Sequence, residues 1–200
     1  RTAAATAVAA RRLAREDART ATICGCGVQG SLQLQALHAV RSLEEALVFD
    51  VSEERAREFA VRMSEMLGIR VTAVSNLGDA CRRSGICVTC TPSRKALLGS
   101  GDVRPGTFIA AVGADHPEKQ ELEPGLMAKS RIVVDVLAQA AAMGELHHAL
   151  DAAAVRADDA TELGEIVAGR KPGRMRDDEI IIFDSTGMAP SSLGSNRTES

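Results

Sequence analysis

The chain has no tryptophan, no tyrosine and only four phenylalanines among its 200 residues. Proteins that stack nucleic-acid bases on their surface rely on exposed aromatic side chains, so this scarcity argues against an RNA-binding module, and likewise against a carbohydrate-binding one. Hydrophobic residues nevertheless make up 45% of the sequence, which is enough for the core of one ordinary domain. That core must be built from alanine, valine, leucine and isoleucine.

An excess of charge of one sign is also missing, as is a long apolar run. The 24 lysines and arginines nearly balance 27 aspartates and glutamates, which leaves no basic surface of the kind that binds nucleic acid. Asp135 interrupts the apolar region around Ile132 to Met143, so no stretch approaches the roughly 20 residues of a membrane-spanning helix. Arg1 to Arg15 resembles a helix and lacks the apolar segment of a signal peptide. We therefore expect a cytoplasmic protein that binds neither nucleic acid nor membrane.

Five cysteines are an odd number, and a chain without a secretion signal has no need of a disulfide framework. Cys87 and Cys90 form a C-x-x-C pattern inside an expected strand, where residues three apart point to opposite faces of the sheet. Two such thiols cannot easily share one metal ion. We expect reduced cysteines and no metal site.

Short apolar runs alternate with segments of helical pattern along the chain. The apolar runs are Ala21 to Cys24, Ala46 to Asp50, Ile69 to Val74, Ile86 to Cys90, Thr107 to Val112, Ile132 to Val136 and Glu179 to Phe183. Helical patterns occupy Val28 to Val40, Ser52 to Leu67 and the alanine-rich region Leu137 to Gly169. This alternation is typical of a parallel sheet wound through right-handed crossovers, and near-continuous apolar strands indicate helices on both faces. The predicted fold class is α/β, a Rossmann-type doubly wound, mostly parallel sheet.

The run from Gly25 to Gly30 reads Gly-Cys-Gly-Val-Gln-Gly and matches the pattern G-x-G-x-x-G. It follows an expected strand and opens an expected helix, a context that predicts a dinucleotide-binding turn. Gly25 would permit the tight turn, Gly27 the close approach of a pyrophosphate, and Gly30 the packing of helix on strand. The helix N-terminus, with Val28 and Gln29, would offer N–H donors to the phosphates. The alternative is a glycine turn that holds no ligand.

Asp50 ends the second expected strand, twenty residues after Gly30. A carboxylate there accepts hydrogen bonds from the hydroxyls of the adenosine ribose and repels a 2′-phosphate, which favours NAD over NADP. Arg55 lies about one helical turn further on and keeps NADP open as the alternative.

Four motifs together resemble the ornithine cyclodeaminase/mu-crystallin family. They are Arg1 to Ala5, the glycine-rich turn with Gln29, Val112 to Leu122, and Phe183 to Gly187. The resemblance implies a Rossmann domain that binds NAD(P)(H), joined in the full protein to a second domain that forms a homodimer and helps to hold an amino or imino acid. Members of that family transfer a hydride at the α-carbon through an imine.

The same resemblance implies roles for three charged residues. Arg1 matches an arginine that grips the substrate carboxylate, for which a guanidinium fork is suited. Asp115 matches the catalytic carboxylate, which can take and return a proton. Lys119 matches a position that contacts the cofactor. The alternatives are a solvent-facing arginine, a turn acid and a solvated loop lysine.

Further cofactor contacts are expected in the loops that follow the strands. By resemblance, Thr91 and Pro92 pass the nicotinamide end of the cofactor, and Val112 and Gly113 open the loop that carries the catalytic acid. Ser185 follows the last strand, where its hydroxyl would either donate to the nicotinamide amide or cap a helix.

We expect residues 1–189 to form the NAD(P)-binding Rossmann domain, with a leading helix and a C-terminal helical and strand return, and residues 190–200 to be a disordered tail. Since the chain starts within a helical pattern at Arg1, we also expect an upstream part of the family's catalytic unit to be absent and this chain alone to lack activity. The predicted function is that of an NAD-dependent enzyme of this family, or its cofactor domain: a cyclodeaminase, amino-acid dehydrogenase or ketimine reductase. The alternative is a non-catalytic NAD(P)H-binding module.

Overall fold

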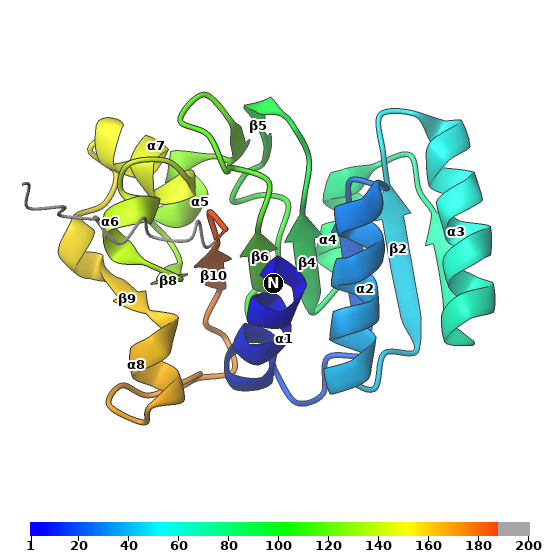
Figure 1. The fold of residues 1–200 in the computed structure, drawn as a ribbon, viewed down its shortest axis with the longest axis horizontal. Helices are drawn as coiled ribbons and strands as arrows, with labels where there is room; N and C mark the ends of the chain where they lie inside the picture. Colours follow the sequence, from blue (N-terminus) through cyan, green and yellow to red (C-terminus); the bar gives the residue numbers. More distant parts are fainter. Residues whose placement is uncertain (188–200) are drawn as a thin grey trace, which may run out of the picture.

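The computed structural model describes residues 1–187, so the expected tail at 190–200 lies outside the described residues. An eight-stranded sheet crosses the molecule in the order β3-β2-β1-β4-β6-β10-β8-β9, and every neighbouring pair is parallel (Figure 1). Its strands are β1 Thr20–Cys24, β2 Glu45–Phe49, β3 Arg70–Ala73, β4 Ile86–Thr89, β6 Phe108–Ala111, β8 Arg131–Val134, β9 Ala160–Glu162 and β10 Ile181–Asp184. The predicted fold class is confirmed.

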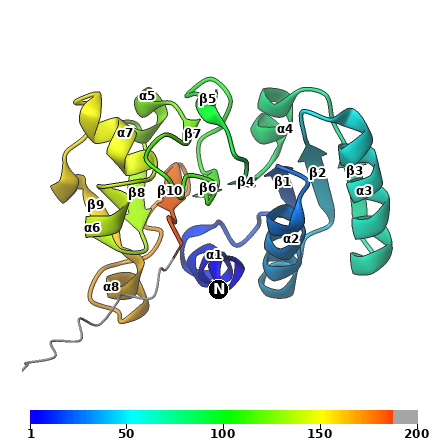
Figure 2. The same cartoon turned by 45° about the horizontal axis from the view of Figure 1, so that its top comes forward.

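Helices cover both faces of this sheet (Figure 2). They are α1 Thr2–Leu13, α2 Val28–Val40, α3 Glu53–Leu67, α4 Leu77–Arg83, α5 Pro124–Met127, α6 Leu137–Ala140, α7 Glu145–Asp151 and α8 Leu163–Val167. Helices α1, α2, α3 and α8 contribute to one core, and α4 to α7 contribute to the other. Within the described residues, no helix has the length and apolar character needed to span a membrane.

Successive side chains along each strand point alternately into the two cores. In β10, Ile181 and Phe183 face one core and Ile182 faces the other, and all three are fully buried. The same rule separates Cys87 from Cys90, which pack against different cores, so the C-x-x-C pattern does not form a pair. All five cysteines are free thiols.

Three parts of the architecture were not predicted from the sequence. The region Leu137 to Gly169, expected to be helical, contains the edge strand β9 between its short helices. The run Glu179 to Phe183 does form a strand, but β10 inserts between β6 and β8 in the middle of the sheet. A second, two-stranded parallel sheet of β5 Arg94–Leu98 and β7 Gln120–Leu122 was not expected at all. These strands are short or paired across long sequence separations, which local periodicity does not encode.

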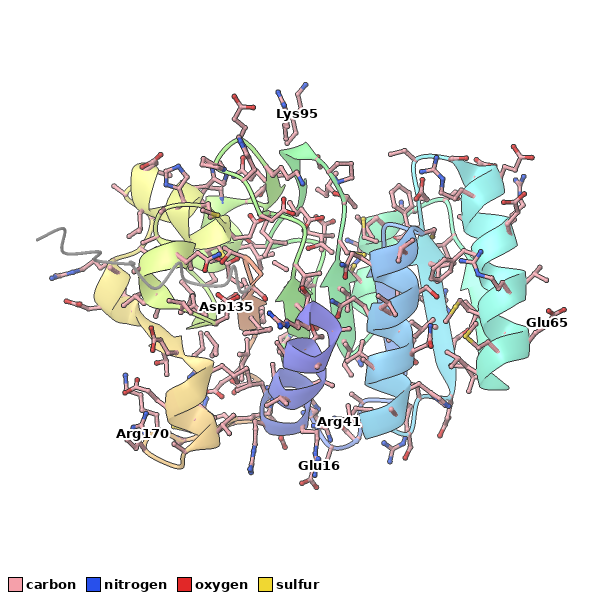
Figure 3. All side chains as sticks on the ribbon, viewed as in Figure 1. Glu16, Arg41, Glu65, Lys95, Asp135 and Arg170 are labelled. Carbon is pink, nitrogen blue, oxygen red and sulfur yellow. The ribbon has the colours of Figure 1, made fainter. Side chains whose placement is uncertain are left out.

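Helix α1 is held at its C-terminal end by two arginines from distant segments. Arg41 donates from Nη2 to the carbonyl oxygens of Ala10 and Ala14, and Arg174 donates from Nε to that of Leu13 at 2.7 Å (Figure 3 labels Arg41). Cations at a helix C-terminus satisfy its free carbonyl groups and oppose its dipole. The basic loop 170–178 therefore anchors α1 and with it the residues at the other end of that helix.

The carboxyl edge of the sheet contains a fully buried acid, Asp184, at the end of β10. Its Oδ2 accepts the N–H of Leu146 at 2.9 Å, whereas Oδ1 has no hydrogen-bond partner among the described residues. Burial, with smaller repulsion from Asp135 and Glu121, raises the pKa of Asp184 to about 7. The free oxygen is the natural place for that proton.

The titration of Asp184 predicts a pH-dependent stability. An unfolded aspartate titrates at about 3.9, so between about pH 4 and pH 7 the folded chain binds more protons than the unfolded chain. This group therefore lowers the free energy of unfolding as pH rises through that window. In urea titrations at pH 5 and pH 7.5, we expect Asp184→Asn to lose less stability between the two pH values than the unmodified chain does.

The exposed Asp158 provides the control for that measurement. Asp158→Asn should leave the difference between the two pH values unchanged. An equal difference in Asp184→Asn and the unmodified chain would show that the proton does not reside on Asp184.

Candidate functional site

The glycine-rich turn lies at the carboxyl end of β1 and leads directly into α2. Gly25 has φ +106°, and a Cβ there would lie 2.7 Å from the carbonyl oxygen of Cys90. A Cβ on Gly30 would lie 2.1 Å from the carbonyl oxygen of Gly25, so the first turn of α2 packs directly on the strand end. Side chains at these two positions would push the turn away from β4 and away from its own helix.

Open space lies above the first turn of α2. Gly27 is the N-cap residue, and a Cβ on it would meet nothing within 4 Å. Ser31 is the residue whose N–H bonds back to the carbonyl of Gly27, so the N–H groups of Val28, Gln29 and Gly30 have no partner within the helix. No acidic residue lies in this first turn. The arrangement offers several donors and the positive end of a helix dipole to an anion.

Asp50 follows the end of β2 and connects it to the glycine-rich turn. Its Oδ2 accepts the N–H of Cys26 at 2.9 Å, and its Oδ1 accepts the N–H of Ser52 at 3.0 Å and Nη1 of Arg55 at 3.3 Å. The carboxyl group is 7% exposed, and each oxygen retains acceptor capacity for a further donor. Ser52 caps α3 by accepting the N–H of Arg55 at 3.3 Å.

A cavity of about 330 Å³ opens between these groups and the loop after β4. Its lining includes Gly25, Gly27, Asp50, Arg55, Thr91 and Pro92. The structure thus brings together the turn, the acid of β2 and the predicted Thr91-Pro92 pair. The neighbouring strands β1 and β4 mark the point where the strand order reverses, and doubly wound folds bind ligands at the carboxyl ends of the strands there.

Thiols near this cavity are not arranged as nucleophiles. Burial, with a contribution from Asp50, raises the pKa of Cys26 to about 12. The Sγ of Cys90 donates to the carbonyl oxygens of Cys24 and Gly25, both at 3.3 Å, and burial also raises its pKa. Both thiols stay protonated near neutral pH, so a cysteine nucleophile is not the chemistry of this site.

The loop after β6 carries Asp115 and Lys119. Oδ1 of Asp115 lies 2.6 Å from Nζ of Lys119, and the Asp115 side chain is 59% exposed. The N–H of Asp115 donates to the carbonyl of Gly113 at 3.0 Å, and Nε2 of His148 lies 2.7 Å from the carbonyl oxygen of Lys119. The acid is thus accessible at the surface of the edge, on a loop supported from below by α7.

Val112 and Gly113, at the start of the same loop, are buried in the structure. The N–H of Val112 donates to the carbonyl of Thr89 at 2.9 Å, which continues the pairing of β6 with β4. The N–H of Gly113 donates to Glu121 at 3.0 Å. With both donors engaged inside the protein, these residues can offer shape and a carbonyl group but not an N–H.

A second cavity, of about 290 Å³, lies further along the edge. Arg1, Asp135 and Ser185 line it together with apolar side chains of α1 and α8 (Figure 3 labels Asp135). The hydroxyl of Ser185 donates to Oδ2 of Asp135 at 3.0 Å. The lone pairs of the Ser185 hydroxyl can therefore accept a hydrogen bond from a ligand N–H in the cavity that it lines. In the structure this hydroxyl donates to Asp135, and the contact of Ser185 with the nicotinamide amide stays a prediction.

The order of the strands places all these groups along one edge. The glycine-rich turn follows β1, Thr91 follows β4, Asp115 follows β6, and Ser185 follows β10, in the spatial sequence β1-β4-β6-β10. Parallel neighbours lie about 4.8 Å apart, so this edge suits an extended ligand. Arg1 and Ser185 do not line the cavity at the glycine-rich turn. The loop that carries Asp115 follows β6, which lies between β4 and β10 in the sheet.

Sequence reasoning assigned no role to the buried carboxylates Glu121, Glu145 and Asp184, which organise these loops. The only available signal was an acid inside an otherwise apolar run, as in Phe183-Asp184. Burial of a charged side chain depends on partners from distant elements, so that signal does not identify its role. Among residues 1–187, no group of three or more histidine, cysteine or carboxylate side chains is placed to hold a metal ion.

Comparison with known proteins gives close relatives. An alanine dehydrogenase from Archaeoglobus fulgidus is 42% identical over 190 residues, which is 94% of this chain and 58% of that protein. The structure of a Δ1-pyrroline-2-carboxylate reductase from Thermococcus litoralis, solved with NADH and L-proline, superposes with a TM-score of 0.91 at 36% identity and covers 93% of this chain and 58% of that one.

A third relative is the iminosuccinate reductase of Paracoccus denitrificans, solved with NAD⁺. It superposes with a TM-score of 0.88 at 37% identity and covers 93% of this chain and 57% of its own. The chain thus spans less than two thirds of the length of each of these relatives. A family model for the ornithine cyclodeaminase/mu-crystallin family matches residues 1–193, in agreement with the four motifs, and the chain belongs to that family.

Proposed function

We propose that this chain is the NAD-binding core of an enzyme that transfers a hydride at the α-carbon of a small amino or imino acid. The observation that carries the proposal is the single sheet edge on which a dinucleotide turn, an accessible carboxylate and an arginine follow one another from β1 to β10. Relatives named for alanine, pyrroline-2-carboxylate and iminosuccinate support the substrate class.

The residues at the β1 end fit a dinucleotide. The open space at Gly27 and the free N–H groups of α2 suit the pyrophosphate, and Asp50 has acceptor capacity for ribose hydroxyls. NAD is favoured over NADP because the Asp50 carboxylate would repel a 2′-phosphate. Arg55, 60% exposed in the same cavity, is the one group there that would favour NADP. When bound, the nicotinamide supplies the hydride acceptor or donor.

The residues nearer β10 fit the substrate. A guanidinium such as that of Arg1 binds a carboxylate by two parallel hydrogen bonds. Asp115 is accessible and can take a proton from the substrate nitrogen and return it. The pocket around the reactive end of the cofactor is formed by the remaining predicted residues, which are Thr91, Pro92, Val112, Gly113, Lys119 and Ser185. The free acceptor lone pairs of Ser185 suit an amide N–H₂.

Two finer proposals concern the complete protein. We infer a homodimer, as one relative, an archaeal alanine dehydrogenase with bound NAD, is described as a dimer. A cytoplasmic location is supported by the five free thiols, which fit a reducing compartment.

The cofactor assignment predicts saturable NADH binding in a fluorescence titration of this chain, with weaker binding of NADPH. Asp50→Ala should weaken NADH binding by about tenfold, because two ribose hydrogen bonds and the tie to the N–H of Cys26 are lost. The same substitution should reduce the preference for NADH over NADPH. Asp158→Ala, at an exposed position, is the matched control and should bind NADH like the unmodified chain.

Folded chain that binds neither nucleotide would contradict the cofactor assignment. If the unmodified chain binds NADH and NADPH with equal affinity, and Arg55→Ala removes NADPH binding alone, the site would instead be assigned to both cofactors.

The catalytic assignment predicts that Asp115→Asn, tested in a chain of the relatives' full length, keeps NADH affinity and lowers turnover by about 100-fold or more. Turnover is followed by NADH absorbance with L-alanine, L-proline and L-ornithine as probes. Glu118→Gln, an exposed acid in the same loop, is the control. Turnover that survives Asp115→Asn would remove the acid from the reaction, and NADH binding without any turnover would favour the non-catalytic NAD(P)H-binding module.

A further inference from the structure

Three buried carboxylates connect β10 to the loops of the cofactor site, and each one bonds to backbone N–H groups. The first is Asp184, whose Oδ2 accepts the N–H of Leu146 in the first turn of α7 at 2.9 Å. Glu145, in the same turn and 1% exposed, is the second. Its two oxygens accept the N–H groups of Glu121 and Leu122 at 2.8 and 2.9 Å. Helix α7 thereby holds strand β7 in place.

Glu121 is the third and reaches the cofactor site itself. Its Oε1 accepts the N–H of Thr91 at 2.6 Å, and its Oε2 accepts the N–H of Gly113 at 3.0 Å. The side chain is fully buried. One carboxylate from β7 thus joins the second residues of the loops after β4 and β6, and these two strands are neighbours in the sheet.

The junction is tightly packed around Gly113. A Cβ on Gly113 would lie 2.5 Å from the carbonyl oxygen of Thr91 and 2.6 Å from Oε1 of Glu121. The carbonyl of Gly113 in turn accepts the N–H of Asp115 at 3.0 Å. A change in the separation of the two loops is therefore passed directly to the candidate catalytic acid.

We propose that Glu121 is a positioning residue that sets the separation of the loops after β4 and β6, and thereby the shape of the site that binds the nicotinamide end of the cofactor. This inference rests on the proposed function, because it assigns Thr91 and Gly113 to that end of the site. The adenosine end is held by Asp50 and the glycine-rich turn, whose hydrogen bonds do not involve Glu121, and shares with the other end only the Thr91 side of the cavity. Loss of Glu121 should therefore weaken binding of the nicotinamide half of the cofactor more than binding of the adenosine half.

The two backbone donors explain why a carboxylate, and not a neutral side chain, is needed at position 121. Burial raises its pKa, and the N–H groups of Thr91 and Gly113 oppose that rise by binding the charged form. A glutamine of the same shape would keep one acceptor oxygen and turn its N–H₂ toward a backbone donor. Two donors facing each other repel, so one of the two loops would move away.

The test compares NADH with ADP, which carries the adenosine and phosphate part alone, by calorimetric titration of the 200-residue chain. In Glu121→Gln we expect NADH affinity to fall by about tenfold while ADP affinity stays within about twofold. Glu123→Gln, the same substitution at an exposed position two residues along, should change neither. A role limited to general stability would not separate the two ligands.

Equal weakening of ADP and NADH by Glu121→Gln, or no change in either, would overturn the positioning role. If circular dichroism shows that this variant does not fold, Glu145→Gln takes its place under the same criterion, since Glu145 holds the strand that carries Glu121. Failure of the unmodified chain to bind either ligand would instead contradict the proposed function.

Discussion

The acceptance of backbone N–H groups by buried carboxylates is the interaction on which the functional edge of this protein depends. Asp50 joins the glycine-rich turn to the start of α3, and Glu121 joins the loops after β4 and β6. Glu145 and Asp184 extend the same pattern through β7 and α7 to β10. A charged acceptor binds N–H donors more strongly than a neutral one, and burial makes the loss of such a bond costly.

This construction suits a site whose loops must be rigid. The loops at the edge are irregular, and their backbone N–H groups would otherwise need water or ligand as partners. Because the carboxylates satisfy them from within the protein, the outward surface remains free for cofactor and substrate. Asp115 and the first turn of α2 remain accessible, and Ser185 keeps its lone pairs free for a ligand.

The buried charges also make this edge sensitive to its own protonation. Burial raises the pKa of Glu121, Glu145 and Asp184, and the three acids repel one another. Glu121 and Glu145 each have two backbone donors, whereas Asp184 has one free oxygen. A proton on Asp184 would remove its share of that repulsion, and the hydrogen bonds that hold the loops are accepted by Glu121 and Glu145.

The sequence by itself determined the parallel sheet, the glycine-rich turn, the place of Asp50 at the end of the second strand, and the family. Each of these depends on local periodicity or on residues close together in the chain. Helices α2 and α3 were predicted with their observed bounds, apart from the cap at Ser52, for the same reason. Tertiary structure alone decided that β10 inserts between β6 and β8, that β5 pairs with β7, and that Glu121 bonds to residues 30 and 8 positions away. These features arise from contacts between distant segments, which leave no periodic pattern in either partner.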